Sequence, residues 1–297
     1  MDIIEQVQKG EKIAIARLIT MLENQNENAV SAVESLYCYN NRPMIIGITG
    51  PPGVGKSTLT GRLAKQFRLS NEKVGIIAVD PSSPFNGGAI LGDRIRMFGL
   101  DDDPGVFLRS MGTRGSIGGL SRSVYGAIKV FGISGMKCVF VETVGTGQNE
   151  IDISKIADIT IVLLTPGLGD DIQAIKAGLM EIADIFVINK ADMDGADQTV
   201  RYITSMLDLD SQTEGRKEII KAIARDGKGT QEIYAAIMRR YQYLQNNGMF
   251  ENKTNSSIDS EIVSIIQDNI LSFMRKTERG VRLLDGLVSQ VRLYSLK

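Results

Sequence analysis

"GPPGVGKST", residues Gly50–Thr58, lies between an apolar run, MIIGIT, and a segment, LTGRLAKQF, whose apolar residues recur at helical spacing. Residues Gly50–Ser57 match G-x-x-x-x-G-K-[ST], a pattern that binds phosphates where it connects a buried strand to a helix. Its glycines let backbone N–H groups point at the phosphates, and the N-terminus of the following helix adds partial positive charge. We therefore predict a nucleotide-binding loop rather than an ordinary connection between a strand and a helix.

The residue types in this loop assign its roles. We expect Lys56 to reach the β and γ phosphate oxygens and Ser57 to bind a magnesium ion beside them. The loop residues expected to contact the nucleotide are Gly50, Pro51, Pro52, Gly53, Val54, Gly55, Lys56, Ser57 and Thr58. The predicted ligand is therefore a nucleoside triphosphate with Mg²⁺.

A second motif, INKAD, follows the apolar run Ile185–Ile188 and matches N-K-x-D, the pattern by which guanine is read. Asp192 would accept hydrogen bonds from the N1–H and the 2-amino group of guanine, while Asn189 and Lys190 would hold the neighbouring loops. Adenine offers neither donor and would leave a desolvated carboxylate unpaired. We expect GTP rather than ATP.

Carboxylates at two further strand ends are candidates for γ-phosphate sensing. In VETVG, Glu142 is expected to hold a magnesium-bound water, and the Gly145 N–H to bond the γ-phosphate and move when it leaves. In AVDPSSPFNGGAILGDRIRM, Asp80 stands at a strand tip and Asp93 beyond a Pro- and Gly-rich loop. This pair suits a magnesium-sensing switch, although Asp in loops is commonly a turn former or a helix cap. Lys56, Asp93 and Glu142 are the predicted catalytic residues.

Short apolar runs alternate with helical segments from Met44 onward. The expected strands are Met44–Thr49, Val74–Val79, Val106–Leu108, Cys138–Val141, Ile159–Leu164 and Ile185–Ile188, with a further run at Ile219–Ala224. Runs that are apolar on consecutive residues indicate strands buried on both faces. We therefore predict an α/β fold, with a mostly parallel central sheet wrapped by helices and ligands bound beyond the carboxyl ends of the strands.

The chain divides into three expected parts: an N-terminal helical segment (1–42) of two or three short helices, a nucleotide-binding domain (43–250) and a C-terminal helical segment (251–297). After the polar stretch GMFENKTNSS, helical spacing resumes at Ile258, with interruptions expected at Gly280 and Gly286. The apolar stripe alone favours a helix docked on its own domain over a partner-binding arm.

Composition excludes several classes of function. The 297 residues carry 34 Lys plus Arg against 35 Asp plus Glu, so a net charge of −1 draws the chain to neither nucleic acid nor anionic lipid. Histidine is absent, which excludes histidine metal ligands and bases. Cys138 is expected to be a buried strand thiol rather than half of a disulfide with Cys38. With no apolar leader and no membrane span, the expected location is the cytoplasm.

Five strings stand in the order found in one family: GPPGVGKST, VDPSSPFNGGAILGDRIRM, VETVGTGQNE, GDDIQAIKAGLMEIAD and VINKAD. The chain resembles the methylmalonyl-CoA mutase-associated GTPases of MeaB or ArgK type, SIMIBI-class P-loop GTPases once labelled lysine/arginine/ornithine transport ATPases. The resemblance is dense over residues 43–230. It implies a homodimeric, Mg²⁺-dependent GTPase that gates cobalamin cofactor loading and protects an adenosylcobalamin-dependent acyl-CoA mutase.

The resemblance also implies roles for individual residues. Ser57, Asp80, Asp93 and Glu142 would form the magnesium shell, and the C-terminal helices would join the dimer. Residues Gly167–Gly178 would be a third switch that responds to the mutase. From the residues themselves, we expect the glycines to permit a hinge and Asp170, Asp171 and Lys176 to exchange ion-pair partners with the mutase. The alternative is that Asp170 and Asp171 only cap the following helix.

Two loops depart from the family pattern. The loop expected to close over guanine has Ile223 where the family usually has serine, so a backbone contact through Ala224 survives and a hydroxyl contact does not. The Gly-rich loop Ser110–Gly119 carries different polar side chains. In addition, no glutamine directly follows Gly145, since Gln148 comes two residues later, so intrinsic hydrolysis is expected to be slow.

Other nucleotide-dependent functions fit the sequence less well. A metallochaperone GTPase of the nickel-delivery type needs His or Cys clusters, which this chain lacks. An ATPase or kinase linked to amino-acid transport would need an adenine site in place of NKAD. A protein-targeting GTPase would need a methionine-rich signal-peptide module, whereas the 12 methionines here are scattered.

Overall fold

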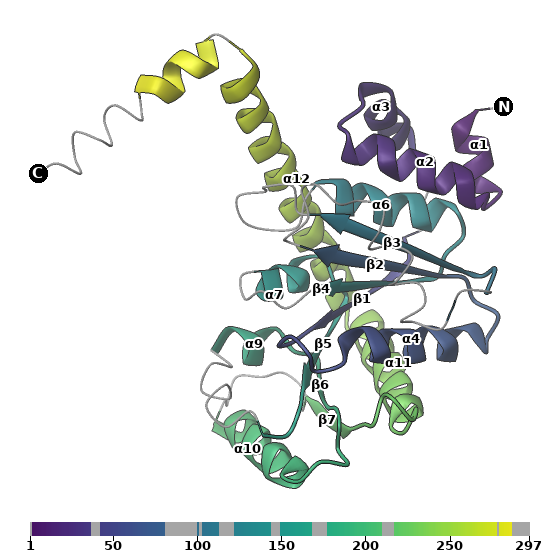
Figure 1. The fold of residues 1–297 in the computed structure, drawn as a ribbon, viewed down its shortest axis with the longest axis vertical. Helices are drawn as coiled ribbons and strands as arrows, with labels where there is room; N and C mark the ends of the chain where they lie inside the picture. Colours follow the sequence, from purple (N-terminus) through teal and green to yellow (C-terminus); the bar gives the residue numbers. More distant parts are fainter. Residues whose placement is uncertain are drawn as a thin grey trace, which may run out of the picture.

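The computed structural model describes residues 2–36, 42–80, 100, 103–112, 122–143, 149–167, 177–209, 217–277 and 279–286. Among them, seven strands form one sheet in the order β3-β2-β4-β1-β5-β6-β7, with every neighbouring pair parallel (Figure 1). The strands are β1 (Met44–Thr49), β2 (Val74–Asp80), β3 (Val106–Gly112), β4 (Cys138–Thr143), β5 (Ile159–Leu164), β6 (Ile185–Ile188) and β7 (Glu218–Lys221).

The predicted α/β fold and all of its predicted strands are confirmed. β1, β5 and β6 have the expected bounds. β3 runs on to Gly112, beyond the expected end at Leu108, because it pairs with the whole of β2. β7 ends before Ala222, whose N–H donates to Ile188 O and whose carbonyl accepts from Ala191 N, so the chain turns toward the loop after β6.

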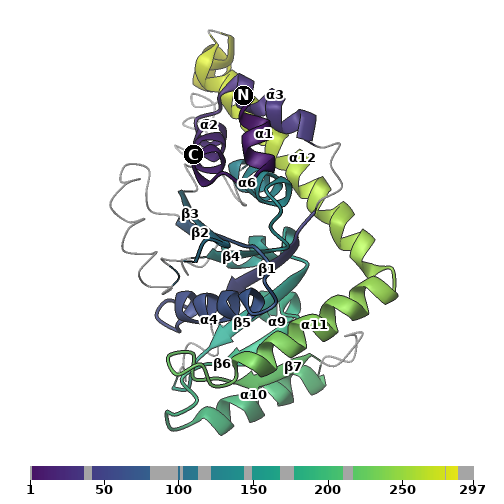
Figure 2. The same cartoon turned by 90° about the vertical axis from the view of Figure 1, so that its right-hand side faces the viewer.

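Helices cover both faces of the sheet (Figure 2). On one face lie α4 (Lys56–Arg68) and α11 (Thr230–Asn246), and on the other α6 (Arg122–Ile133), α9 (Ala177–Ile182) and α10 (Ala196–Leu209). A short helix, α7 (Asn149–Asp152), and a 3₁₀ turn, η1 (Ile153–Lys155), lead into β5. Because both faces are covered, β1, β4, β5 and β6 are buried along their whole length.

The N-terminal segment forms three short helices, as predicted: α1 (Ile3–Gln8), α2 (Lys12–Glu23) and α3 (Glu27–Leu36). They lie over α6 on the side away from the sheet (Figure 2). Ile15, Leu18 and Ile19 of α2 are buried in the same apolar cluster as Val130 and Phe131 of α6. The N-terminal helices therefore add a layer to the core of the sheet.

The C-terminal helix α12 (Met249–Lys276) begins nine residues before Ile258, so most of the polar stretch expected to precede the helix is part of it. The break from α11 lies at Gly248, whose φ of 69° turns the chain. Phe250 supports this first turn, because its ring meets the ring of Tyr241 at 5.5 Å and the Arg42 guanidinium at 5.1 Å. Tertiary contacts thus extend the helix into a polar sequence.

An ionic network fixes α12 to the amino-terminal edge of the sheet. Asp158 and Asp184 come directly before β5 and β6 and are buried. Lys253 Nζ donates to the Asp158 carbonyl at 2.6 Å and to Asp184 Oδ2 at 3.0 Å, and Arg240 Nε donates to Asp184 Oδ1 at 2.9 Å. Arg42 lies 2.8 Å from Asp158 Oδ1. Burial raises the pKa of Asp158, and the Arg42 charge opposes that shift.

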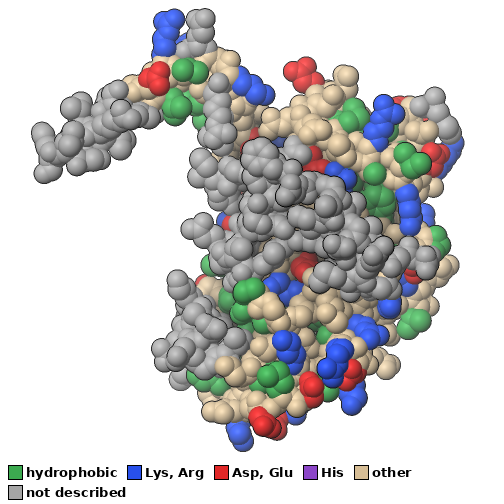
Figure 3. Space-filling view, viewed as in Figure 1, with side chains coloured by type: hydrophobic (Ala, Val, Ile, Leu, Met, Phe, Trp, Pro, Cys, Tyr) green, Lys and Arg blue, Asp and Glu red, His purple; other side chains and the backbone are tan. Residues whose placement is uncertain are grey.

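Further along, α12 crosses α6 and then extends away from the body of the protein as an arm (Figures 1 and 3). Lys129 of α6 donates to both carboxylate oxygens of Glu261, at 2.6 and 2.8 Å. Beyond this contact the helix carries apolar side chains that are about half exposed: Ile262, Val263, Ile266, Ile270 and Phe273. The helix is therefore held to α6 through Glu261 while its apolar stripe stays about half exposed, which differs from the docking that the pattern alone favours.

The predicted break at Gly280 occurs earlier. Thr277 is extended, with φ −108° and ψ 144°, and residues 279–286 are helical again. A Cβ at Gly280 would lie 2.2 Å from the Phe273 carbonyl oxygen, so this glycine permits a close return of the chain against the end of α12. None of the described helices combines the length and the hydropathy that crossing a bilayer requires.

Candidate functional site: a phosphate loop and a base-reading loop

The phosphate loop connects the end of β1 to the start of α4. Gly50 has φ 140°, and a Cβ there would lie 2.1 Å from the Leu163 carbonyl oxygen of β5. Gly55 has φ 96°, and a Cβ there would lie 2.5 Å from the Asn189 side-chain nitrogen. Both positions therefore require glycine, for backbone conformation and for close approach of neighbouring groups.

Lys56 is buried inside this loop, with 6% of the residue exposed. Its Nζ donates to the carbonyl oxygens of Gly50 at 2.7 Å and Pro51 at 2.8 Å. Carbonyl groups hold the ammonium in place while leaving it the formal charge that attracts phosphate. Pro52, Gly53 and Thr58 are exposed around it, whereas the side chain of Val54 belongs to the apolar core, so Val54 offers only its backbone.

Ser57 and Glu142 meet at the end of β4. Ser57 Oγ donates to Glu142 Oε1 at 2.5 Å, and Glu142 is 4% exposed. Thr60, one helical turn after Ser57, places its Oγ1 3.0 Å from Glu142 Oε2 and 2.9 Å from the Lys56 carbonyl. Thr60 was not among the predicted site residues, although its spacing of i+3 puts it on the same face of α4 as Ser57.

This pair of groups fits Mg²⁺, which prefers oxygen ligands. A serine hydroxyl and an acidic side chain stand side by side, next to the loop that carries Lys56. Within the described parts of the chain, no three His, Cys, Asp or Glu side chains form a group that could hold a metal. Asp80 ends β2, but its side chain and the whole of Asp93 lie outside the described residues, so two of the four expected ligands are described.

The loop after β6 ties three segments together. Asn189 Nδ2 donates to the Val54 carbonyl at 2.7 Å, and Asn189 Oδ1 accepts from the Ala224 N–H at 2.9 Å. Lys190, with φ 55°, donates from Nζ to the Gly53 carbonyl at 3.0 Å. These contacts hold the phosphate loop, the loop after β6 and the loop after β7 in one arrangement.

Asp192 lies at the outer end of this arrangement, with its side chain 45% exposed and within reach of a ligand. Arg225 Nη2 is 3.7 Å from Asp192 Oδ2. Arg62, on α4, donates from Nε to the Ala224 carbonyl at 3.1 Å and from Nη2 to the Arg225 carbonyl at 2.5 Å. Neither arginine belongs to a sequence motif, and Arg62 and Ala224 are 162 residues apart in sequence, so no local pattern indicates this contact.

Other predicted site residues lie outside the described parts of the chain: Gly145 beside the γ-phosphate, and Asp170, Asp171 and Lys176 of the expected third switch. Cys38, the second cysteine, also lies outside them, while Cys138 is buried and its thiol pKa is raised by burial.

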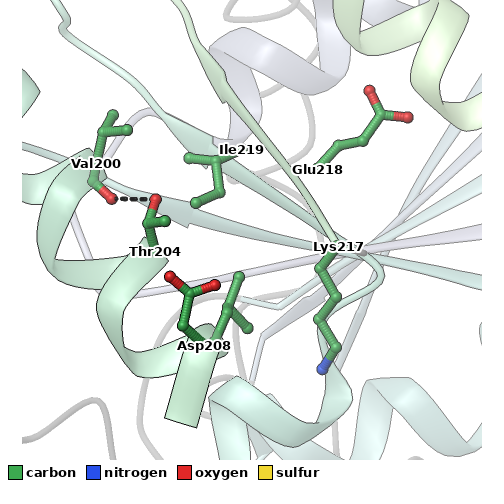
Figure 4. Close-up of a pocket in the computed structure, with 7 residues that line it drawn as sticks. Val200, Thr204, Asp208, Lys217, Glu218 and Ile219 are labelled. Atoms are coloured by element: carbon green, nitrogen blue, oxygen red, sulfur yellow. Dashed lines mark hydrogen bonds between the residues drawn. The ribbon is translucent and has the colours of Figure 1, made fainter. Parts of the chain in front are cut away.

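A separate cavity of about 780 Å³ lies between α10 and the start of β7 (Figure 4). Thr204 and Asp208 of α10 line it together with Lys217 and Glu218. It opens near the amino-terminal end of β7, whereas ligands of open α/β sheets bind beyond the carboxyl ends of strands. We therefore place the nucleotide site at the phosphate loop and not in this cavity.

Comparison with known proteins agrees with this geometry. A family model described as methylmalonyl-CoA mutase-associated GTPase MeaB matches residues 15–279. A Pyrococcus horikoshii protein that bears the name of a GTPase is 45% identical over 294 residues, covering 98% of this chain and 92% of its own. The mouse mitochondrial methylmalonic aciduria type A homolog is 31% identical over 294 residues, covering 92% of this chain and 70% of its own.

Among solved structures, a protein titled LAO/AO transport system kinase superposes with a TM-score of 0.73. It is 24% identical, and the match covers 98% of this chain and 91% of that one, so it supports the fold. The match of the family model to most of the chain, together with the phosphate loop and the N-K-x-D loop on a seven-stranded parallel sheet, leads to one conclusion: the chain belongs to the methylmalonyl-CoA mutase-associated GTPase family and is a nucleotide-binding P-loop GTPase.

Proposed function

We propose that this GTPase is a chaperone of an adenosylcobalamin-dependent acyl-CoA mutase, gating loading of the cobalamin cofactor and protecting the mutase. The family match over residues 15–279 carries the proposal, because the family is named for its association with such a mutase. The name of the mouse relative refers to methylmalonic aciduria, which points to the same metabolism.

The phosphate loop would bind the triphosphate of GTP. Lys56 exchanges its carbonyl partners for β and γ phosphate oxygens, which are better acceptors because they are charged. Ser57 and Glu142, with Asp80 and Asp93, would hold Mg²⁺, which would supply positive charge at the phosphates when bound. Lys56, Asp93 and Glu142 are the proposed catalytic residues, with Gly145 as the γ-phosphate sensor.

The base would lie against the loops after β6 and β7. Asp192 accepts from N1–H and the 2-amino group of guanine, and its exposure leaves it open to them. Asn189 and Lys190 hold the adjoining loops, and Ala224 would close the pocket through its backbone. A carboxylate facing two donors rejects adenine, because adenine lacks both.

The useful output would be a change in the partner. We expect slow hydrolysis by the protein alone and stimulation by the mutase, with Asp170, Asp171 and Lys176 exchanging ion-pair partners between the two proteins. In the sequence, the segment that holds them comes directly before α9.

The test is the GTPase rate with and without a cobalamin-dependent mutase, for the wild type and Asp171→Ala. Loss of stimulation at unchanged thermal stability supports the switch; full stimulation with a lowered melting temperature supports a helix cap instead. The matched control is Asp197→Ala, an exposed aspartate in the first turn of α10, which we expect to keep stimulation. Absence of stimulation in the wild type by any such mutase would reject the chaperone role.

The arm formed by α12 is the proposed dimer contact. Ile258, Ile262, Ile266 and Ile270 recur every fourth residue and are about half exposed, so they form one apolar face. Ile266→Asp would place a charge in that contact and yield a monomer by light scattering. Ile13→Asp, at an exposed isoleucine of α2, is the control and should keep the wild-type mass. A dimer that survives Ile266→Asp would contradict the arm contact.

A further inference from the structure

Arg225 reaches from the loop after β7 toward Asp192 in the loop after β6. Its Nη2 lies 3.7 Å from Asp192 Oδ2, and its Nε donates to Asp226 Oδ1 at 3.0 Å. The Arg225 side chain is 78% exposed and that of Asp192 is 45% exposed, so a ligand can approach both from solvent. An ionised carboxylate has about four acceptor sites, so an arginine beside one oxygen leaves sites for other donors.

The backbone from which this side chain extends is held on two sides. Arg62 of α4 donates to the carbonyls of Ala224 and Arg225, and Asn189 accepts from the Ala224 N–H. The first of these contacts comes from the helix that begins at Lys56, and the second from the loop that leads to Asp192. The backbone of Arg225 is therefore held in place relative to both the phosphate loop and the loop that carries Asp192.

No hydroxyl is available from the residue before Ala224. The side chain of Ile223 is a hydrocarbon, and its backbone N–H donates to the Lys228 carbonyl at 3.0 Å. A guanidinium on the same loop, two residues later, is the group that meets Asp192 instead. Its planar fork of donors suits the orientation of a carboxylate.

We propose that Arg225 is a positioning residue for guanine recognition: its guanidinium orients the Asp192 carboxylate toward the N1–H and 2-amino group, while Arg62 holds the Arg225 backbone in place. This inference rests on the proposed assignment of Asp192 to guanine. It makes Arg225 the residue that sets how sharply the protein distinguishes bases, without contact to the reacting phosphates.

The measurement is the preference for GDP over IDP, which lacks the 2-amino group, taken from displacement of a fluorescent GDP analogue. We expect Arg225→Met to lower this preference about tenfold. Without the guanidinium, the Asp192 carboxylate would be misaligned with the 2-amino group of guanine. Arg225→Lys, which keeps a cationic donor at this position, should retain most of the preference. Arg239→Met, which removes an exposed arginine paired only across the surface with Glu218, should leave the preference as in the wild type.

An unchanged preference in Arg225→Met, or an equal loss in Arg239→Met, overturns the inference. So does a loss in Arg225→Lys as large as that in Arg225→Met, because the cation beside Asp192 would then have no part in the preference. Asp192→Asn distinguishes a wrong assignment of Asp192 to guanine from a wrong role for Arg225. If it keeps the wild-type preference, the guanine assignment fails; if it abolishes the preference while Arg225→Met does not, only the role of Arg225 fails.

Discussion

The two edges of the sheet use charged residues in different ways. At the carboxyl edge, Lys56 donates to backbone carbonyls and Glu142 accepts from hydroxyls. At the amino edge, Asp184 is paired with Lys253 and Arg240. The carboxyl-edge contacts hold Lys56 and Glu142 beside the phosphate loop, where a nucleotide is expected. The amino-edge ion pairs instead join β6 to α11 and α12.

Lys56→Ala should have the largest effect and should act on function alone. Removing the ammonium takes away the charge that we propose meets the β and γ phosphates, so we expect GTP turnover to fall on the order of 1000-fold. Thermal melting should change little, because the substitution removes hydrogen bonds within one loop, to the carbonyls of Gly50 and Pro51, and no side chain of the apolar clusters. Hydrolysis at the wild-type rate would reject the phosphate site.

Asp184→Asn should give the opposite result. It leaves the Lys253 and Arg240 cations without their anion next to the core, where removal of one partner of a buried ion pair costs about 3 kcal/mol of unfolding free energy. Urea or thermal unfolding measures this loss. GDP affinity should stay within about twofold of the wild type, and a large loss of affinity at unchanged stability would contradict the division between the two edges.

Asp192→Asn probes the carboxyl edge more finely. An amide nitrogen facing guanine N1–H replaces an acceptor by a donor, so we expect GTP affinity to fall about 100-fold. Xanthosine triphosphate, which presents an oxygen in place of the 2-amino group, should bind better to this variant than to the wild type. Calorimetry that finds GTP bound as tightly as before would exclude Asp192 as the base reader.

Asp158→Asn should have the smallest effect on the free energy of unfolding, and the sign of this effect depends on pH. Burial raises the folded-state pKa of Asp158, so the folded protein favours the protonated acid. The raised pKa therefore stabilises the folded protein fully at pH values below the unfolded-state pKa of Asp158. This stabilisation is lost as the pH rises through the folded-state pKa. The wild type should therefore lose stability relative to the variant on going from pH 4 to pH 7. A difference that stays constant across this window would contradict the raised pKa.

The sequence predicted the parts of the molecule that depend on local pattern. The central strands are predictable because strands covered on both faces are mostly apolar on consecutive positions, as in MIIGIT and ITIVLL. Lys56, Ser57 and Asn189 belong to contiguous motifs whose spacing carries the chemistry. These features need no knowledge of how distant segments pack.

The parts that were missed depend on contacts between segments far apart in sequence. Arg62 and Arg225 are positioned by the register of α4 against the loop after β7, and α12 begins in the polar residues before Ile258 because Lys253 and Phe250 find partners on other elements. Helix propensity favours none of Asn252, Thr254 and Asn255.

β6 is only four residues long, yet each of its flanking residues serves a different edge: Asp184 pairs with the arm and Asn189 holds the nucleotide loops. At about 3.3 Å per residue, the two are separated by about 16 Å of backbone. One residue inserted between them would turn every later side chain to the opposite face of the sheet. During evolution this segment can therefore exchange one apolar side chain for another. A change in its length would break either the contact of Asp184 with α12 or the contacts of Asn189 with the nucleotide loops.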